Sequence, residues 1–197
     1  MNSLIGIDKF AYAVNTKDDK EGTAYSPTVF LEGISELTHP TGTKRKEYAG
    51  DEGVEEVCTK QGAANIGLKL ADLPNRDLAA LLREDYDANS GLFTLSQRGK
   101  SPYAAIMYRC QKENGAYRYV KLLKARGVIE KSTHKAVFED VTPSEMMMNF
   151  YGVKRKFDGK IEYRIDSDDP NFPIKKADME AFEAAWFGDP DYILKEG

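Results

Sequence analysis

Hydrophobic and polar residues alternate along most of this chain with the two-residue period of β-strands. Every second residue of Ala64–Leu70 is apolar, and the residues between them are polar or glycine. Phe10, Tyr12 and Val14 repeat the pattern near the N-terminus. Such alternation is typical of a strand that buries one face. The sequence therefore predicts a strand at both places.

A hairpin is predicted where two aromatic-rich, strand-like segments, Tyr103–Cys110 and Ala116–Leu123, flank Asn114-Gly115. Asn-Gly is a strong hairpin signal because both positions of the favoured two-residue turn need positive φ angles. We expect the two segments to pair in an antiparallel sheet.

Two further pairs of strand-like segments lie downstream. Gly127–Lys131 is expected to pair with Lys135–Val141, and Phe150–Phe157 with Lys160–Ile165 across the turn dipeptide Asp158-Gly159. In all we expect about eight to ten short antiparallel strands. This pattern is typical of a mainly β protein that forms an antiparallel sandwich or barrel.

Helical spacing interrupts the strands over Asp72–Asp85. Leu78, Leu81 and Leu82 form one apolar stripe there, and Asp72 is placed to cap the first turn. The sequence predicts one helix that flanks the strands.

A second helix is predicted over Lys175–Phe187. Met179, Phe182 and Trp186 fall on one face of it, and Gly188 is expected to end it in the left-handed conformation. This helix forms a C-terminal extension of the β domain.

The net negative charge lies at the C-terminal end of the chain. The 197 residues include 28 Lys+Arg and 32 Asp+Glu, for a net charge of -4. Residues 166–197 hold nine acidic and three basic residues, a net charge of -6, so residues 1–165 carry +2. We predict a β domain over 1–165, followed over 166–197 by an acidic linker and a helix. A net acidic chain argues against a dedicated nucleic-acid binder, and no apolar run is long enough to span a bilayer.

The polar segment Thr38–Gly62 contains few apolar residues. A loop of this length is uncommon in a compact domain unless it is functional or contacts a partner. The alternative is a solvated hairpin with a charged face. The residues that this segment offers to a partner are Lys44, Arg45, Lys46, Tyr48, Asp51, Glu52, Glu55 and Glu56.

No group of residues has the pattern of a catalytic site. His39 precedes Pro40 in a predicted loop, His134 lies between strands, and neither belongs to a nucleophile motif. We interpret both as surface or turn histidines. Acidic residues are abundant, so a pair of carboxylates for acid–base catalysis stays an alternative.

Metal, cofactor and phosphate sites are not predicted. Cys58 and Cys110 have no cysteine or histidine at ligand spacing. Asp166 and Asp168 resemble the first ligands of a calcium loop, but Pro170 stands at the next ligand position. No glycine-rich loop is followed by lysine at Walker spacing.

Two short clusters have both a structural and a functional interpretation. Lys154–Lys156 is interpreted as a solvated basic face, with nucleic-acid contact as the alternative. In a strand, Met146 and Met148 would face one side and Met147 the other. Core packing is the simpler account of these methionines, and an adaptable interface is the other.

Several segments along the chain recur together in one known family. They are IGIDKFAYAV with KDD after it, YAGDEGVEE, ADLP with AALL, PYAAIMYR, NGAYRYVKLLK and RIDSDDPNF. In order and spacing, from about residue 4 to residue 172, they resemble the major tail protein family of long-tailed (siphovirus-type) phages and prophages of Gram-positive bacteria. The family usually has YADDG where this chain has Tyr48–Gly53, and glycine where it has Arg83.

The resemblance implies a tail-tube subunit without catalysis, metal or cofactor. Such subunits form hexameric rings, and the rings stack into a tube that carries DNA into the host. The implied fold is a β-sandwich or barrel with a flanking helix. The implied partners are further copies of the chain, tape-measure and terminator proteins, and DNA that passes without specific binding. The implied location is the phage tail, after synthesis in the host cytoplasm and without membrane insertion.

The physical features of the sequence are consistent with this role. Strand edges that a monomer must protect can pair between the subunits of a ring, and Thr38–Gly62 is the candidate arm for stacking rings. An acidic lumen would keep DNA mobile. Two alternatives remain: another virion component, such as a tube terminator or capsid decoration protein, or a hydrolase with a carboxylate pair.

Overall fold

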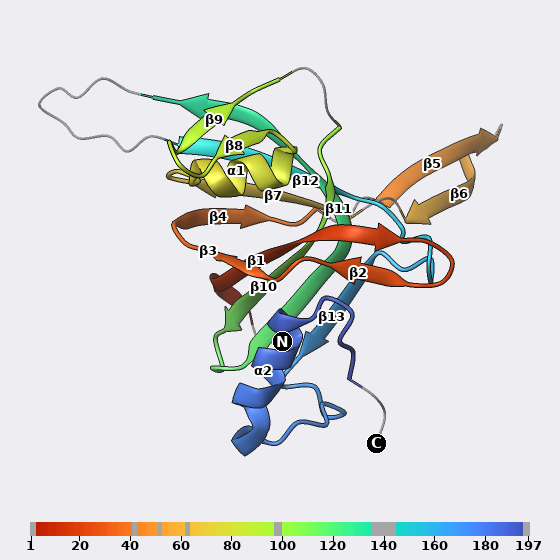
Figure 1. Ribbon diagram of the computed structural model, residues 1–197. Coiled ribbons are helices and arrows are strands. Elements are labelled where there is room, and N and C mark those ends of the chain that lie inside the picture. The colour runs from red at the N-terminus through yellow and green to blue at the C-terminus, as the bar shows by residue number, and fades with distance from the viewer. Residues whose placement is uncertain are drawn as a thin grey trace, which may run out of the picture.

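The computed structural model describes residues 3–40, 43–50, 53–61, 64–96, 100–134 and 145–194, with 43–50 and 53–61 described by their backbone. The fold is mainly antiparallel β, as predicted, with a large sheet and a C-terminal helix (Figure 1). The sheet has nine strands. They are β1 (Leu4–Asp18), β2 (Thr23–Tyr25), β3 (Val29–Leu31), β4 (Ile34–Thr38), β7 (Asn65–Leu70), β10 (Tyr103–Lys112), β11 (Tyr117–Thr133), β12 (Glu145–Gly152) and β13 (Glu162–Asp166).

Four short strands form two separate ribbons. β5 (Thr43–Gly50) pairs with β6 (Gly53–Gln61), and β8 (Asp85–Asp87) pairs with β9 (Leu92–Thr94). The segment Thr38–Gly62 therefore contains a hairpin, the alternative to an irregular loop in the sequence analysis.

The long strand β11 organises the main sheet, in which the strand order is β2-β1-β10-β11-β12-β7-β4. It pairs with β10 along one edge. Along the other edge it pairs with β13 over Arg118–Leu122 and with β12 over Ala125–Thr133. The predicted pairing of Phe150–Phe157 with Lys160–Ile165 is therefore wrong, because their strands β12 and β13 both pair with β11. Lys135–Val141, the predicted partner of Gly127–Lys131, lies outside the described residues.

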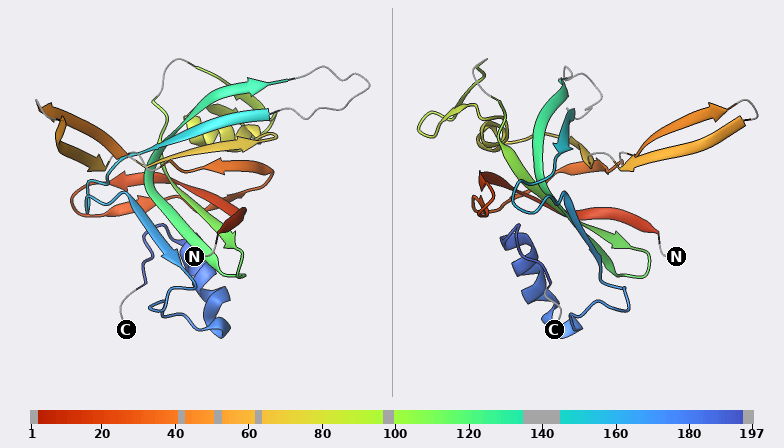
Figure 2. Two further views of the ribbon diagram at one scale, coloured as in Figure 1. Left: turned by 180° about the vertical axis from the view of Figure 1, so that it is seen from behind. Right: turned by 90° about the vertical axis from the view of Figure 1, so that its right-hand side faces the viewer.

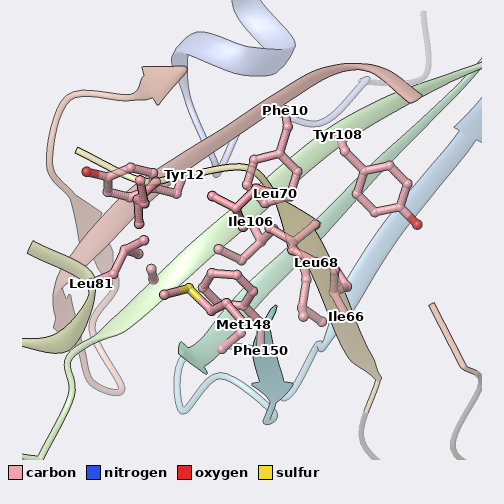
Figure 3. Packing of buried hydrophobic residues seen from close by; sticks show 14 of the residues in the cluster. Phe10, Tyr12, Ile66, Leu68, Leu70, Leu81, Ile106, Tyr108, Met148 and Phe150 are labelled. Carbon is pink, nitrogen blue, oxygen red and sulfur yellow. The ribbon is translucent and has the colours of Figure 1, made fainter. Parts of the chain in front are cut away.

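The inner face of the sheet encloses the main core (Figure 3). Its large side chains come from β1, β7, β10, β11 and β12 and are buried. They include Phe10, Tyr12, Ile66, Leu68, Leu70, Ile106, Tyr108, Leu122, Met148 and Phe150. Because β1 and β7 are distant in strand order yet share this cluster, the sheet curls over itself in a sandwich-like way.

Helix α1 (Asn75–Leu82) packs against the same core. Its Leu78 and Leu81 are buried, as their helical spacing predicted. Asp77 is also buried, and its Oδ1 accepts a hydrogen bond of 2.8 Å from the hydroxyl of Tyr12 on β1. This bond supplies the polar partner that a buried carboxylate needs.

Helix α2 (Met179–Gly188), preceded by a 3₁₀ turn over Lys176–Asp178, covers the opposite face of the sheet. Ala11, Ala13 and Met107 are fully buried beneath it, and the small side chains leave room for Phe182 and Trp186. Burying each aromatic ring stabilises the docked helix by about 1.5–3 kcal/mol. The helix thus packs on its own chain. The division of the chain at residues 165 and 166 stays a prediction.

The helix ends differ from those predicted. α1 begins after Pro74, because the carboxylate of Asp72 accepts the N–H of Leu73 outside the helix. α2 includes Gly188 and ends at Asp189 in extended conformation, so the predicted left-handed glycine is wrong.

The Asn114-Gly115 turn joins β10 to β11 as predicted, but its geometry differs. Only Gly115 has a positive φ, of 78°. The side chain of Asn114 instead accepts the N–H of Ala116 at 3.1 Å. A three-residue hairpin with glycine in the left-handed region explains this arrangement.

Candidate assembly surfaces

The β5–β6 hairpin, which we call the arm, projects from the body of the protein (Figures 1 and 2). Its register runs from Thr43 opposite Gln61 to Gly50 opposite Gly53. Within the described part of the chain its strands pair only with each other. The arm holds Lys44, Arg45, Lys46, Tyr48, Glu55 and Glu56 of the predicted contact residues. Asp51 and Glu52 lie outside the described residues.

The hairpin register separates the arm's charges along its length. Lys44 stands opposite Lys60, near the body, and Lys46 stands opposite Cys58. In the outer half, Tyr48 stands opposite Glu56. The basic stretch of the sequence therefore lies in the half of the arm near the body, and the acidic stretch lies in its outer half.

The loop that leads into the arm holds a histidine whose side chain is largely covered. His39 follows β4, and its side chain is 9% exposed. Its Nδ1 lies 2.6 Å from the hydroxyl of Tyr108, and its Nε2 lies 3.1 Å from a carboxylate oxygen of Glu162. Burial by itself raises the pKa of Glu162, but His39 and Arg164 outweigh this effect and hold that pKa below its usual value. His39 therefore lies in a loop, as predicted, but its side chain is largely covered and not at the surface.

A cavity of about 460 Å³ lies beside this histidine, between the start of β1 and strand β4. Leu4 and Ile5 line it and are 45% and 60% exposed. Among the described strands, β4 pairs only with β7, and the first residues of β1 pair only with β10. Two strand edges with unpaired backbone groups therefore face this cavity.

Cys110 and Tyr108, which also line the cavity, are not activated for catalysis. Burial raises the pKa of the Cys110 thiol to about 11 and raises that of Tyr108 above its ordinary value. Both groups stay protonated at neutral pH, whereas a nucleophile needs a lowered pKa or an adjacent base that takes its proton.

The loop between β12 and β13, which we call the basic loop (Val153–Lys160), is tightly held. Arg155 is 3% exposed, and its guanidinium contacts Asp158, Asp191 and the hydroxyl of Tyr163. The prediction of a solvated basic face over Lys154–Lys156 is therefore wrong for Arg155, which turns inward. Lys154 and Lys156 are exposed, as predicted.

Four acidic residues of the C-terminal extension, Asp166, Asp168, Glu183 and Asp191, pair with basic residues of the β domain. Asp166 and Asp168 both pair with Lys112, and Asp166 also pairs with Arg118. The weak resemblance of this segment to a calcium loop therefore reflects an ion-pair cluster. In the described ranges no group of three or more His, Cys, Asp or Glu residues is arranged to hold a metal ion.

Lys121 joins the extension to the sheet. It is fully buried, and its Nζ donates hydrogen bonds to the carbonyl oxygens of Asp189 at 2.8 Å and Tyr192 at 3.0 Å. The nitrogen also lies 4.3 Å from the centre of the Trp186 ring. Burial lowers the pKa of Lys121 to about 7. The sequence analysis missed this residue, whose signal is a lysine at an inward position of an apolar strand.

No helix in the described part of the chain is long and apolar enough to cross a membrane. No family model and no curated protein matches the sequence. Among solved structures, the fold is similar to a chain of the anti-feeding prophage baseplate, with 8% identity, a TM-score of 0.40, and coverage of 82% of this chain and 94% of that one. It is also similar to a chain of the tube-terminating cap of the anti-feeding prophage, with 11% identity, a TM-score of 0.38, and coverage of 79% and 87%. These overlaps are partial and by themselves say nothing about function.

Proposed function

We propose that this chain is a structural subunit of a phage tail tube and assembles with copies of itself. The arm is the observation that carries the proposal. An isolated two-stranded hairpin is marginally stable in water, so contact with another molecule is what would hold it in place. The resemblance in sequence to the major tail protein family, from about residue 4 to residue 172, supports the same assignment.

The open strand edges support a ring. β4 forms one end of the main sheet, and β2 and β3 lie at the other. Pairing the edge of one subunit with the opposite edge of the next makes a head-to-tail contact, which closes after a fixed number of copies. We propose a hexameric ring, with the arm reaching the next ring of the stack. The partners are then other copies, the tape-measure and terminator proteins, and DNA that slides through the lumen.

Two other functions are less well supported. A tube terminator or capsid decoration protein would also use open edges and an arm, but it would not polymerise without limit. A hydrolase with a carboxylate pair needs one carboxyl group with a raised pKa to act as the acid, whereas His39 and Arg164 hold the pKa of Glu162 below its usual value.

Electron microscopy and sedimentation of the purified chain test the proposal. We expect rings or tubes for the full chain, and rings that do not stack when Thr43–Gln61 is replaced by a short Gly-Ser linker. Growth to indefinite length distinguishes a tube subunit from a terminator, which would stop at a single ring. A full chain that stays monomeric at high concentration would rule the proposal out.

A further inference from the structure

The basic loop presents three lysines around an exposed aromatic ring. Lys154, Lys156 and Lys160 are exposed, and Phe157 between them is 49% exposed. Aromatic residues that stand in the open beside polar ones are enriched at protein interfaces. The surface therefore has the composition of a contact site for an acidic partner.

The backbone of this loop is fixed before any partner arrives. The carboxylate of Asp18 accepts the N–H groups of Lys156 at 2.9 Å and Phe157 at 3.3 Å. From the inside, the buried Arg155 holds Asp158, and Gly159 takes the positive φ of 70° that the turn requires. A preorganised surface loses less conformational entropy on binding.

The acidic residues nearest to the basic loop are already engaged. Asp18 pairs with Lys124, Asp19 with Lys17, and Asp158 with Arg155. Within the described ranges, none of the three exposed lysines takes part in an ion pair. The loop is left with an uncompensated positive charge that a partner can neutralise.

The outer half of the arm has the complementary charge. It carries Glu47, Glu55 and Glu56, and the residues opposite Glu47 and Glu56 are Val57 and Tyr48. No basic residue stands opposite these acids in the hairpin register. In the C-terminal extension, Asp166, Asp168, Glu183 and Asp191 are paired within the subunit, whereas the arm projects away from its own body (Figure 2).

We propose that the acidic outer half of the arm of one copy binds the basic loop of a second copy. This inference rests on the proposed function, because it assigns the surface that receives the arm in the assembly. Charge complementarity sets which surfaces meet and in which register. The contact weakens as salt rises, because the lysines of the basic loop are exposed to solvent ions.

Charge reversal on each side, separately and together, tests the contact. The variants are K154E/K156E, E55K/E56K and the combination of all four substitutions. The matched control, K175E/K176E, reverses two exposed lysines that precede α2. Assembly is followed by sedimentation velocity and negative-stain microscopy at low and high salt, and circular dichroism checks that each variant is folded.

We expect each single-sided reversal to raise the concentration needed for assembly by about tenfold or more at low salt. The combined variant restores the attraction with the signs exchanged, so the concentration that it needs for assembly should return close to that of wild type. The control should also assemble at the wild-type concentration. Single-sided variants that assemble like wild type would overturn the contact, and so would a folded combined variant that does not recover. Either result leaves the tube proposal intact, whereas a monomeric wild-type chain refutes both.

Discussion

Lys121 makes the stability of the C-terminal extension depend on pH. In the unfolded chain its pKa is near the ordinary lysine value of 10.5, and burial lowers the folded pKa to about 7. Between these values the unfolded state binds more protons than the folded state, so the free energy of unfolding rises with pH. The stability that Lys121 contributes in its neutral form is complete above pH 10.5, is lost as pH falls, and is absent below pH 7. The difference between the folded and unfolded pKa of Lys121 corresponds to a change of about 5 kcal/mol in the free energy of unfolding over the whole window.

The substitution K121M isolates this effect, because methionine fills a similar volume and does not titrate. From pH 7.5 to pH 9.5 we expect the wild-type free energy of unfolding to rise by about 2–3 kcal/mol relative to the variant. Urea unfolding followed by tryptophan fluorescence measures the difference. Trp186 is the single tryptophan of the chain and lies against Lys121, so it reports on this region directly.

The comparison has a clear negative outcome. If wild type and K121M change in parallel across this pH range, Lys121 is not held neutral in the folded state and the reasoning fails. A control variant, K175M, removes an exposed lysine and should follow wild type at every pH.

Three further substitutions test single contacts, and urea unfolding measures each of them. Y12F removes the bond that Asp77 accepts and should cost about 1–3 kcal/mol, because the carboxylate stays buried. G152A places a Cβ 2.4 Å from the carbonyl oxygen of Ala64 and should cost about 1–3 kcal/mol. R155M leaves its acidic partners without a cation and should cost about 3–5 kcal/mol, with selective loss of order in the basic loop by hydrogen exchange.

Each of these substitutions has a matched control at an exposed site. Y151F removes an exposed hydrogen bond to Glu130, and G22A adds a Cβ in open space. K154M removes an exposed charge beside Arg155. The free energy of unfolding of all three controls should stay within about 0.5 kcal/mol of the wild-type value. A test substitution that behaves like its control would show that the contact is unimportant for stability.

The sequence predicted strands well where one face is buried and the turn is short. The alternation in β7 and the Asn-Gly turn between β10 and β11 are local signals, and both were confirmed. Strand partners are not a local property. β11 is 17 residues long and holds two strands along one edge, which no pattern within β12 or β13 reveals.

The burial of polar side chains is the second feature that the sequence did not predict. His39, Lys121 and Arg155 are polar by type, so a composition argument places them at the surface. Each is buried because a partner distant in sequence satisfies it, such as Glu162 for His39 and Asp191 for Arg155. The predicted residues of the arm lie together on one hairpin, and their role in assembly stays a prediction.

The shared edge of β11 has a mechanical consequence. Hydrogen bonds between antiparallel strands lie perpendicular to the strand direction. A pull along β11 therefore loads its bonds to β10, β12 and β13 in parallel, as a shear, and they must break together. A pull across the tip of the arm instead opens the bonds between β5 and β6 one at a time. The body is thus built to resist extension, while the arm yields at much lower force.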